Sequence, residues 1–106
     1  MTRIAFVAFC TLAGLSGFAY AADQTIGQKG RVFSSESVTL RKGEVLVFNN
    51  DDSIPHNVMS ATTGSEFNLG SVAPGGNAQV RFDKAGDVAV ICAIHPRMKM
   101  SVKITD

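Results

Sequence analysis

The chain has 106 residues, and its ten Lys and Arg against nine Asp and Glu give a net charge of only +1 at pH 7. This length supports one small domain, with room for only a modest core. The near-neutral charge, without any long run of one sign, argues against nucleic acid or a charged membrane surface as a partner.

The first residues have the pattern of a secretory signal peptide. Arg3 precedes an apolar stretch over residues 4–18, and Ala19-Tyr20-Ala21 places small residues around a possible cleavage point. The stretch is short for a membrane span, so an uncleaved anchor is the less favoured alternative. We therefore expect a cleaved signal peptide at 1–21, one exported domain at 22–106, and no membrane insertion after cleavage.

Residues 22–106 predict an all-β domain. Short alternating or apolar segments are separated by Gly, Pro, Asn and Asp, as is typical of strands joined by turns, and no stretch has a helical period. The pattern favours a two-sheet Greek-key β-sandwich. Its predicted strands are Lys29–Ser34, Ser37–Leu40, Val45–Phe48, His56–Met59, Ala78–Phe82, Val88–Cys92 and Ser101–Thr105, whereas 61–71 gives no clear pattern.

Cysteine content points to a metal or to burial. Cys10 leaves with the signal peptide, so Cys92 remains as the only thiol and no intramolecular disulfide can form. An unpaired thiol in an oxidising compartment is a liability unless a metal binds it or the fold buries it.

The neighbours of Cys92 favour a metal. His95, Met98 and Met100 follow within a few residues, and His56 lies far upstream. Alone, Cys92 would be interpreted as a buried core residue and His56 as a turn residue. Together, one Cys, two His and one Met form the ligand set of a blue-copper site, with Met as the weak axial ligand.

These motifs resemble those of the cupredoxins, the type 1 (blue) copper proteins that include amicyanin, plastocyanin and pseudoazurin. The resemblance rests on Asn49-Asn50 before Pro55-His56-Asn57, on turns at Lys42-Gly43-Glu44 and Pro74-Gly75, and on Cys92-x-x-His95. It implies a monomeric β-sandwich that binds one copper ion and is not an enzyme. It also implies a soluble one-electron carrier in the bacterial periplasm that acts between larger redox proteins, such as a cytochrome c or a periplasmic dehydrogenase or reductase. A copper carrier or storage protein without redox shuttling is the alternative.

The resemblance also assigns individual residues. It implies His56, Cys92, His95 and Met98 as metal ligands, with amicyanin-like spacing from His95 to Met98. Met100, which has the plastocyanin-like spacing, is the less favoured axial ligand.

Around the ligands, Pro55 is expected to fix His56. Ala93 replaces the Ser or Thr that commonly bonds Asn57, so we expect Asn57 to bond backbone instead. Pro96, with the exposed charges of Arg97 and Lys99, is the expected docking surface for an acidic partner.

Overall fold

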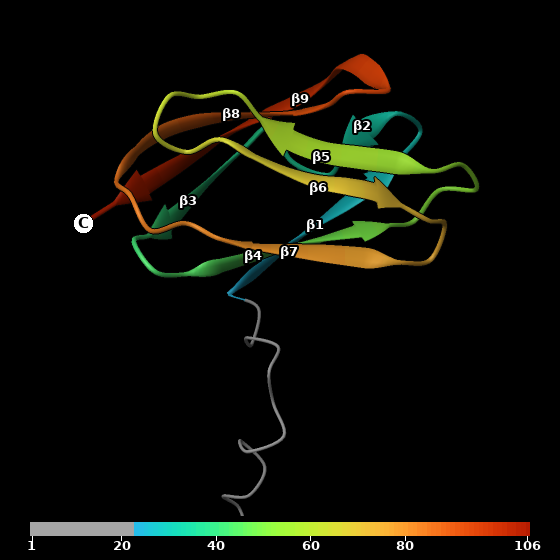
Figure 1. Cartoon of the computed structure of the whole chain (residues 1–106). Coiled ribbons are helices and arrows are strands. Elements are labelled where there is room, and N and C mark those ends of the chain that lie inside the picture. Colours follow the sequence, from blue (N-terminus) through green and yellow to red (C-terminus); the bar gives the residue numbers. More distant parts are fainter. Residues whose placement is uncertain (1–22) are drawn as a thin grey trace, which may run out of the picture.

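The computed structural model describes residues 23–106, which form two packed β-sheets (Figure 1). The strands of this part of the chain are β1 (Gln24–Lys29), β2 (Val32–Phe33), β3 (Ser37–Arg41), β4 (Val45–Asn50), β5 (His56–Ser60), β6 (Phe67–Val72), β7 (Asn77–Arg81), β8 (Gly86–Cys92) and β9 (His95–Thr105). One sheet has the order β2-β1-β4-β7 and the other the order β3-β9-β8-β5-β6. The predicted all-β sandwich is confirmed.

The predicted signal peptide, 1–21, lies outside the described residues, and so does Cys10 within it. Residues 23–106 contain no helix with the length and apolar content needed to cross a membrane.

Parallel pairings bring distant parts of the chain together. Most neighbouring strands are antiparallel, but β1 runs parallel to β4 and β3 runs parallel to β9. In the second case Val38 lies opposite Val102, so the last strand is inserted between β3 and β8. Both parallel pairs need connections that leave the sheet and return to it, as in a sandwich with crossovers.

The core fills the space between the two sheets. Along β9 every second residue from Met98 to Ile104 is buried and the residues between them are exposed, which is the period of a strand with one face inward. The rings of Phe33 and Phe48 meet edge to face with centroids 5.8 Å apart. The packed core comprises Ile26, Phe33, Leu40, Leu46, Phe48, Val58, Val72, Phe82, Val88, Val90, Cys92, Met98, Met100, Val102 and Ile104.

The predicted first strand, Lys29–Ser34, is wrong. The chain turns at Gly30 and Arg31, whose φ angles of 64° and 61° lie in the left-handed region. Two such residues between paired strands make the hairpin turn whose twist matches its flanking strands. Residues other than glycine, such as Arg31, rarely adopt this conformation. The alternating pattern around Arg31 therefore predicts a continuous strand instead of a turn.

Two other boundaries also differ from prediction. The strand predicted to end at Phe48 continues to Asn50, because Asn49 and Asn50 still pair with neighbouring strands as part of β4. The last strand begins at His95 rather than at Ser101, so Met98 and Met100 also lie on it.

Candidate metal centre

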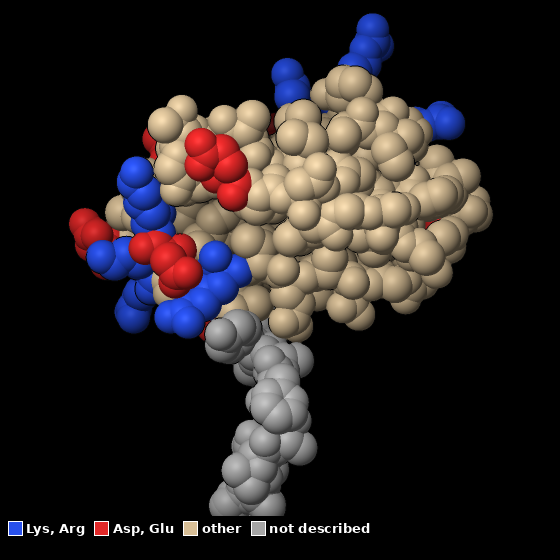
Figure 2. All heavy atoms as spheres, in the orientation of Figure 1, with Lys and Arg blue, Asp and Glu red and all other residues tan. Residues whose placement is uncertain are grey.

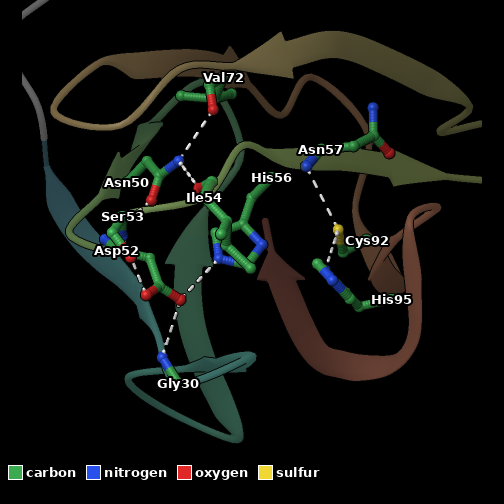
Figure 3. A network of polar contacts seen from close by, with 10 residues as sticks. All are labelled: Gly30, Asn50, Asp52, Ser53, Ile54, His56, Asn57, Val72, Cys92 and His95. Carbon is green, nitrogen blue, oxygen red and sulfur yellow. Dashed lines mark hydrogen bonds and ion pairs between the residues drawn. The ribbon is translucent and has the colours of Figure 1, made fainter.

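Three predicted ligands meet at one end of the second sheet. His56 begins β5, Cys92 ends β8 and His95 begins β9, and β5 and β8 are neighbouring strands. One potential ligand atom from each residue lies within 4.8 Å of the other two. Figure 3 shows the side chain of His95 beside Cys92, and the side chain of His56 projects from the start of β5.

The cluster is closed on one side and open on the other. His56 and Cys92 are fully buried, whereas His95 is partly exposed. The two imidazole rings lie edge to face with centroids 5.1 Å apart, and Cys92 Sγ lies 3.8 Å from His95 Nδ1. One imidazole therefore connects a buried thiol to the surface.

The polar contacts of His56 leave one ring nitrogen for a metal. Its Nε2 lies 3.0 Å from Asp52 Oδ2, and because a carboxylate only accepts hydrogen bonds, Nε2 is the donor. Its Nδ1 is buried and has no hydrogen-bond partner among the described residues. A buried polar atom without a partner is costly, and ligation of a metal removes that cost.

Asp52 is itself held firmly. Its Oδ2 also accepts the Gly30 N–H at 3.0 Å, and its Oδ1 accepts the Ser53 N–H at 3.0 Å. The hydrogen bond from His56, followed by those from the two backbone amides, holds the pKa of Asp52 below its ordinary value. The carboxylate therefore stays ionised beside the ring of His56 (Figure 3).

The loop before His56 is fixed by a buried amide. Asn50 Nδ2 donates to the carbonyl oxygens of Ile54 and Val72 at 2.9 and 2.8 Å, and Asn50 Oδ1 accepts the Asp52 N–H at 2.9 Å. Asn50 thus satisfies backbone groups that the turn leaves free. The hydrogen bonds of this loop come from Asn50 and Asp52, and Pro55, the residue expected to fix His56, is exposed.

The thiol of Cys92 is joined to β5 through Asn57. The Asn57 backbone N–H donates to Cys92 Sγ at 3.2 Å, and Asn57 Oδ1 accepts the Ala93 N–H at 3.0 Å. The expectation that Asn57 bonds backbone where Ala93 offers no hydroxyl is confirmed. The hydrogen bond from the Asn57 N–H holds the sulfur in place at the end of β8.

Met98 and Met100 are both buried on β9, the strand that begins with His95. The antiparallel ladder of β8 and β9 pairs Val90 with Met100 and Ile91 with Lys99, then shifts so that Cys92 lies opposite His95. Without that shift, Cys92 would lie opposite Met98. Met98 therefore lies in the irregular segment next to the cluster, and Met100 lies in the regular ladder behind it.

The predicted docking residues all lie on β9, the strand that begins with His95. Pro96, Arg97 and Lys99 are exposed. A shallow hollow of about 450 Å³ is lined by Arg31, Ile94, His95, Pro96, Arg97 and Met98, and Ile94 is 53% exposed. In Figure 2, Lys and Arg side chains project along the upper edge near β2 and β9, whereas acidic side chains gather towards the opposite end among other basic ones.

Sequence reasoning misses two residues of this region. The residues around Asp52 predict only an ordinary turn. The one feature of the sequence that could have indicated its contact with His56 is the spacing of four residues between them. Arg31 falls within a predicted strand, so its place in the hollow that His95 also lines could not be inferred. Both positions depend on the β1–β2 turn, which local pattern does not reveal.

A buried thiol and two imidazoles, held at one end of a β-sandwich, define a copper protein of the cupredoxin class. Residues 20–105 match the family described as "Copper binding proteins, plastocyanin/azurin family", and the chain belongs to that family. A search of curated protein sequences gives no significant match.

Solved structures share the fold. A novel purple cupredoxin from Nitrosopumilus maritimus is 23% identical with a TM-score of 0.71, covering 78% of this chain and 100% of that one. A variant of amicyanin in its reduced state is 18% identical with a TM-score of 0.72, covering 84% and 87% of the two chains. A copper-containing nitrite reductase from Thermus scotoductus SA-01 is 20% identical with a TM-score of 0.74, covering 83% of this chain and 23% of that enzyme.

The residues present fit the metal of the family. Sulfur and imidazole ligands suit copper, and the unpartnered Nδ1 of His56 lies in the same cluster as Cys92 and His95. The chain is therefore a copper-binding cupredoxin with one copper ion, and in general terms an electron-transfer protein.

Proposed function

We propose that this chain is a periplasmic type 1 copper protein that carries single electrons between larger redox proteins. The observation that carries the proposal is the compact cluster of His56, Cys92 and His95, in which a buried imidazole nitrogen lacks a partner among the described residues. We infer export through a signal peptide at 1–21 and a monomeric domain at 22–106. We assign no enzymatic reaction, because both His of the chain belong to this one cluster.

In this proposal the copper is held by His56, Cys92, His95 and Met98, and it supplies the reversible uptake of one electron. The protein contributes rigidity. Asp52 orients His56, Asn57 orients Cys92, and burial of both ligands keeps water away from the buried side of the site. Ligands fixed in advance need to move little when the charge of the site changes, which favours fast electron exchange.

We propose Met98 rather than Met100 as the thioether that would bind the copper. The support is the ladder register, which places Met98 beside the Cys92–His95 step and Met100 opposite Val90. Met98 is also the more deeply buried of the two, at 1% against 5% exposure. A thioether at this place tunes the reduction potential without dominating the binding energy.

The electron leaves through His95 in this proposal. An apolar contact built on Ile94 and Pro96 would exclude water next to the ring, and Arg31, Arg97 and Lys99 would attract an acidic partner. Charges at the rim of such a contact act mainly on the rate of encounter, and redox encounters are small and short-lived. Arg31 is an addition to the docking surface predicted from the sequence.

The first test is reconstitution with copper followed by visible spectroscopy and redox titration. We expect an intense thiolate-to-copper band and a reversible one-electron titration. Cys92→Ser is expected to abolish the band and most copper affinity, because a hydroxyl is a poor soft donor. Copper binding without such a band would favour a copper carrier or storage protein, and an unchanged band in Cys92→Ser would refute the ligand assignment.

The second test concerns docking. Arg97→Glu with Lys99→Glu is expected to leave the visible spectrum intact and to slow electron exchange with an acidic c-type cytochrome, most strongly at low salt, where screening is weak. The matched control is Arg41→Glu with Lys103→Glu, which makes the same charge change at exposed positions near the other end of β3 and β9. Equal rates and salt slopes for the two double variants would refute the docking surface.

A further inference from the structure

The environment of Asp52 differs from that of the neighbouring acidic residue. Asp51 is exposed, whereas the side chain of Asp52 is only 18% exposed and contacts the fully buried imidazole of His56. Its two oxygens accept three hydrogen bonds, from Gly30, Ser53 and His56, so the carboxylate has one fixed orientation. If Asp52 only stabilised the turn, its carboxylate would not need the contact with the imidazole ring of His56.

The contact determines which ring nitrogen carries the proton. In a neutral imidazole one nitrogen donates and the other accepts. Because the carboxylate accepts from Nε2, the proton is on Nε2 and the lone pair is on Nδ1. Nδ1 is the buried atom without a partner in the described residues, so the ring is already in the form that a metal needs.

The same contact places a negative charge near the metal. A carboxylate bonded to the far nitrogen of a ligating imidazole increases the basicity of that ligand, and loss of such a partner typically lowers metal affinity about 10–100-fold. A more basic ligand and a nearby negative charge both favour the more highly charged Cu(II) over Cu(I).

From these observations we propose that Asp52 is a positioning residue that locks His56 in the Nε2–H tautomer and biases the site toward Cu(II), lowering the reduction potential. The proposal rests on the proposed function only for its second half, because the tautomer is a property of the protein without metal.

The bias toward Cu(II) is tested on the copper-loaded protein. Asp52→Asn removes the charge and keeps a side chain of similar size, and Asp51→Asn makes the same charge change on the exposed neighbour. We expect Asp52→Asn to lower the ratio of Cu(II) to Cu(I) affinity about tenfold, which raises the one-electron potential by about 59 mV. Asp51→Asn is expected to change the ratio less than about threefold. Equal shifts for the two variants, or a lower potential in Asp52→Asn, would overturn the bias.

The metal-free protein tests the tautomer. Long-range ¹H–¹⁵N spectra of the imidazoles are expected to show His56 as a single Nε2–H tautomer in the wild type and as a mixture in Asp52→Ala. A mixture in the wild type, or an unchanged single tautomer in Asp52→Ala, would overturn the lock. Because these spectra need no copper, failure of the copper assignment would be distinguishable from failure of this inference. If Asp52 had only a structural role, its replacement would alter the free energy of unfolding but neither the tautomer of His56 nor the reduction potential.

Discussion

Asn57 offers a quantitative test of how the ligands are held. Its side chain is buried and makes three hydrogen bonds, accepting from Ala93 N–H at 3.0 Å and donating to Asn68 Oδ1 and the Gly70 carbonyl at 2.9 and 3.0 Å. A typical intramolecular hydrogen bond contributes about 0.5–1.5 kcal/mol net. Asn57→Ala is therefore expected to lower the free energy of unfolding of the metal-free protein by about 2–4 kcal/mol.

This loss is large for a domain of this size, whose total stability is of the order of 5–15 kcal/mol. The assay is urea unfolding followed by circular dichroism, since the chain has no Trp to report by fluorescence. Asn68→Ala is the comparison, because it removes only one of the three bonds of Asn57, together with the exposed bond from Gly70 N–H. A loss below about 1 kcal/mol in Asn57→Ala, or equal losses in both variants, would refute the reasoning, because water would then replace these bonds at little cost.

Two further predictions concern buried side chains. Met98→Gln is expected to shift both the visible spectrum and the reduction potential, and Met100→Gln much less, as measured on copper-loaded protein; the reverse would place Met100 in the axial position. Gln28 is fully buried, and neither polar atom of its amide has a hydrogen-bond partner within residues 23–106. Gln28→Met, which keeps the length of the side chain, is expected to raise the free energy of unfolding by about 1–2 kcal/mol in the same urea assay, and a decrease would contradict this.

Sequence reasoning worked best where the chemistry is concentrated in few residues. Cys92 and His95 lie close together in the sequence, and their combination with His56 in a chain with a single thiol after the predicted signal peptide favours a metal over a purely structural role. The alternation of Val88–Cys92 and Ser101–Thr105 likewise revealed strands, because one side of each faces the core. The cluster formed by the three residues was therefore predictable, whereas the individual ligand assignments remain proposals.

Features that depend on pairing at a distance were not predictable. Strand β1, at Gln24–Lys29, is largely polar, and its place is set by parallel pairing with β4 rather than by its own pattern. The turn at Gly30 and Arg31 comes directly after β1, and there the Gly30 N–H donates to Asp52. Since no local signal specifies these contacts, the support of His56 became visible only in three dimensions.

The position of β9 has a consequence for folding. The strand lies between β3 and β8, so the second sheet cannot close until residues 95–105 have been inserted. The first residue of that strand is His95, and Cys92 lies just before it. Pairings between segments far apart in the chain form slowly. Insertion of β9 is therefore the step that brings His95 against Cys92, and we expect a complete copper site only in a molecule whose second sheet has closed.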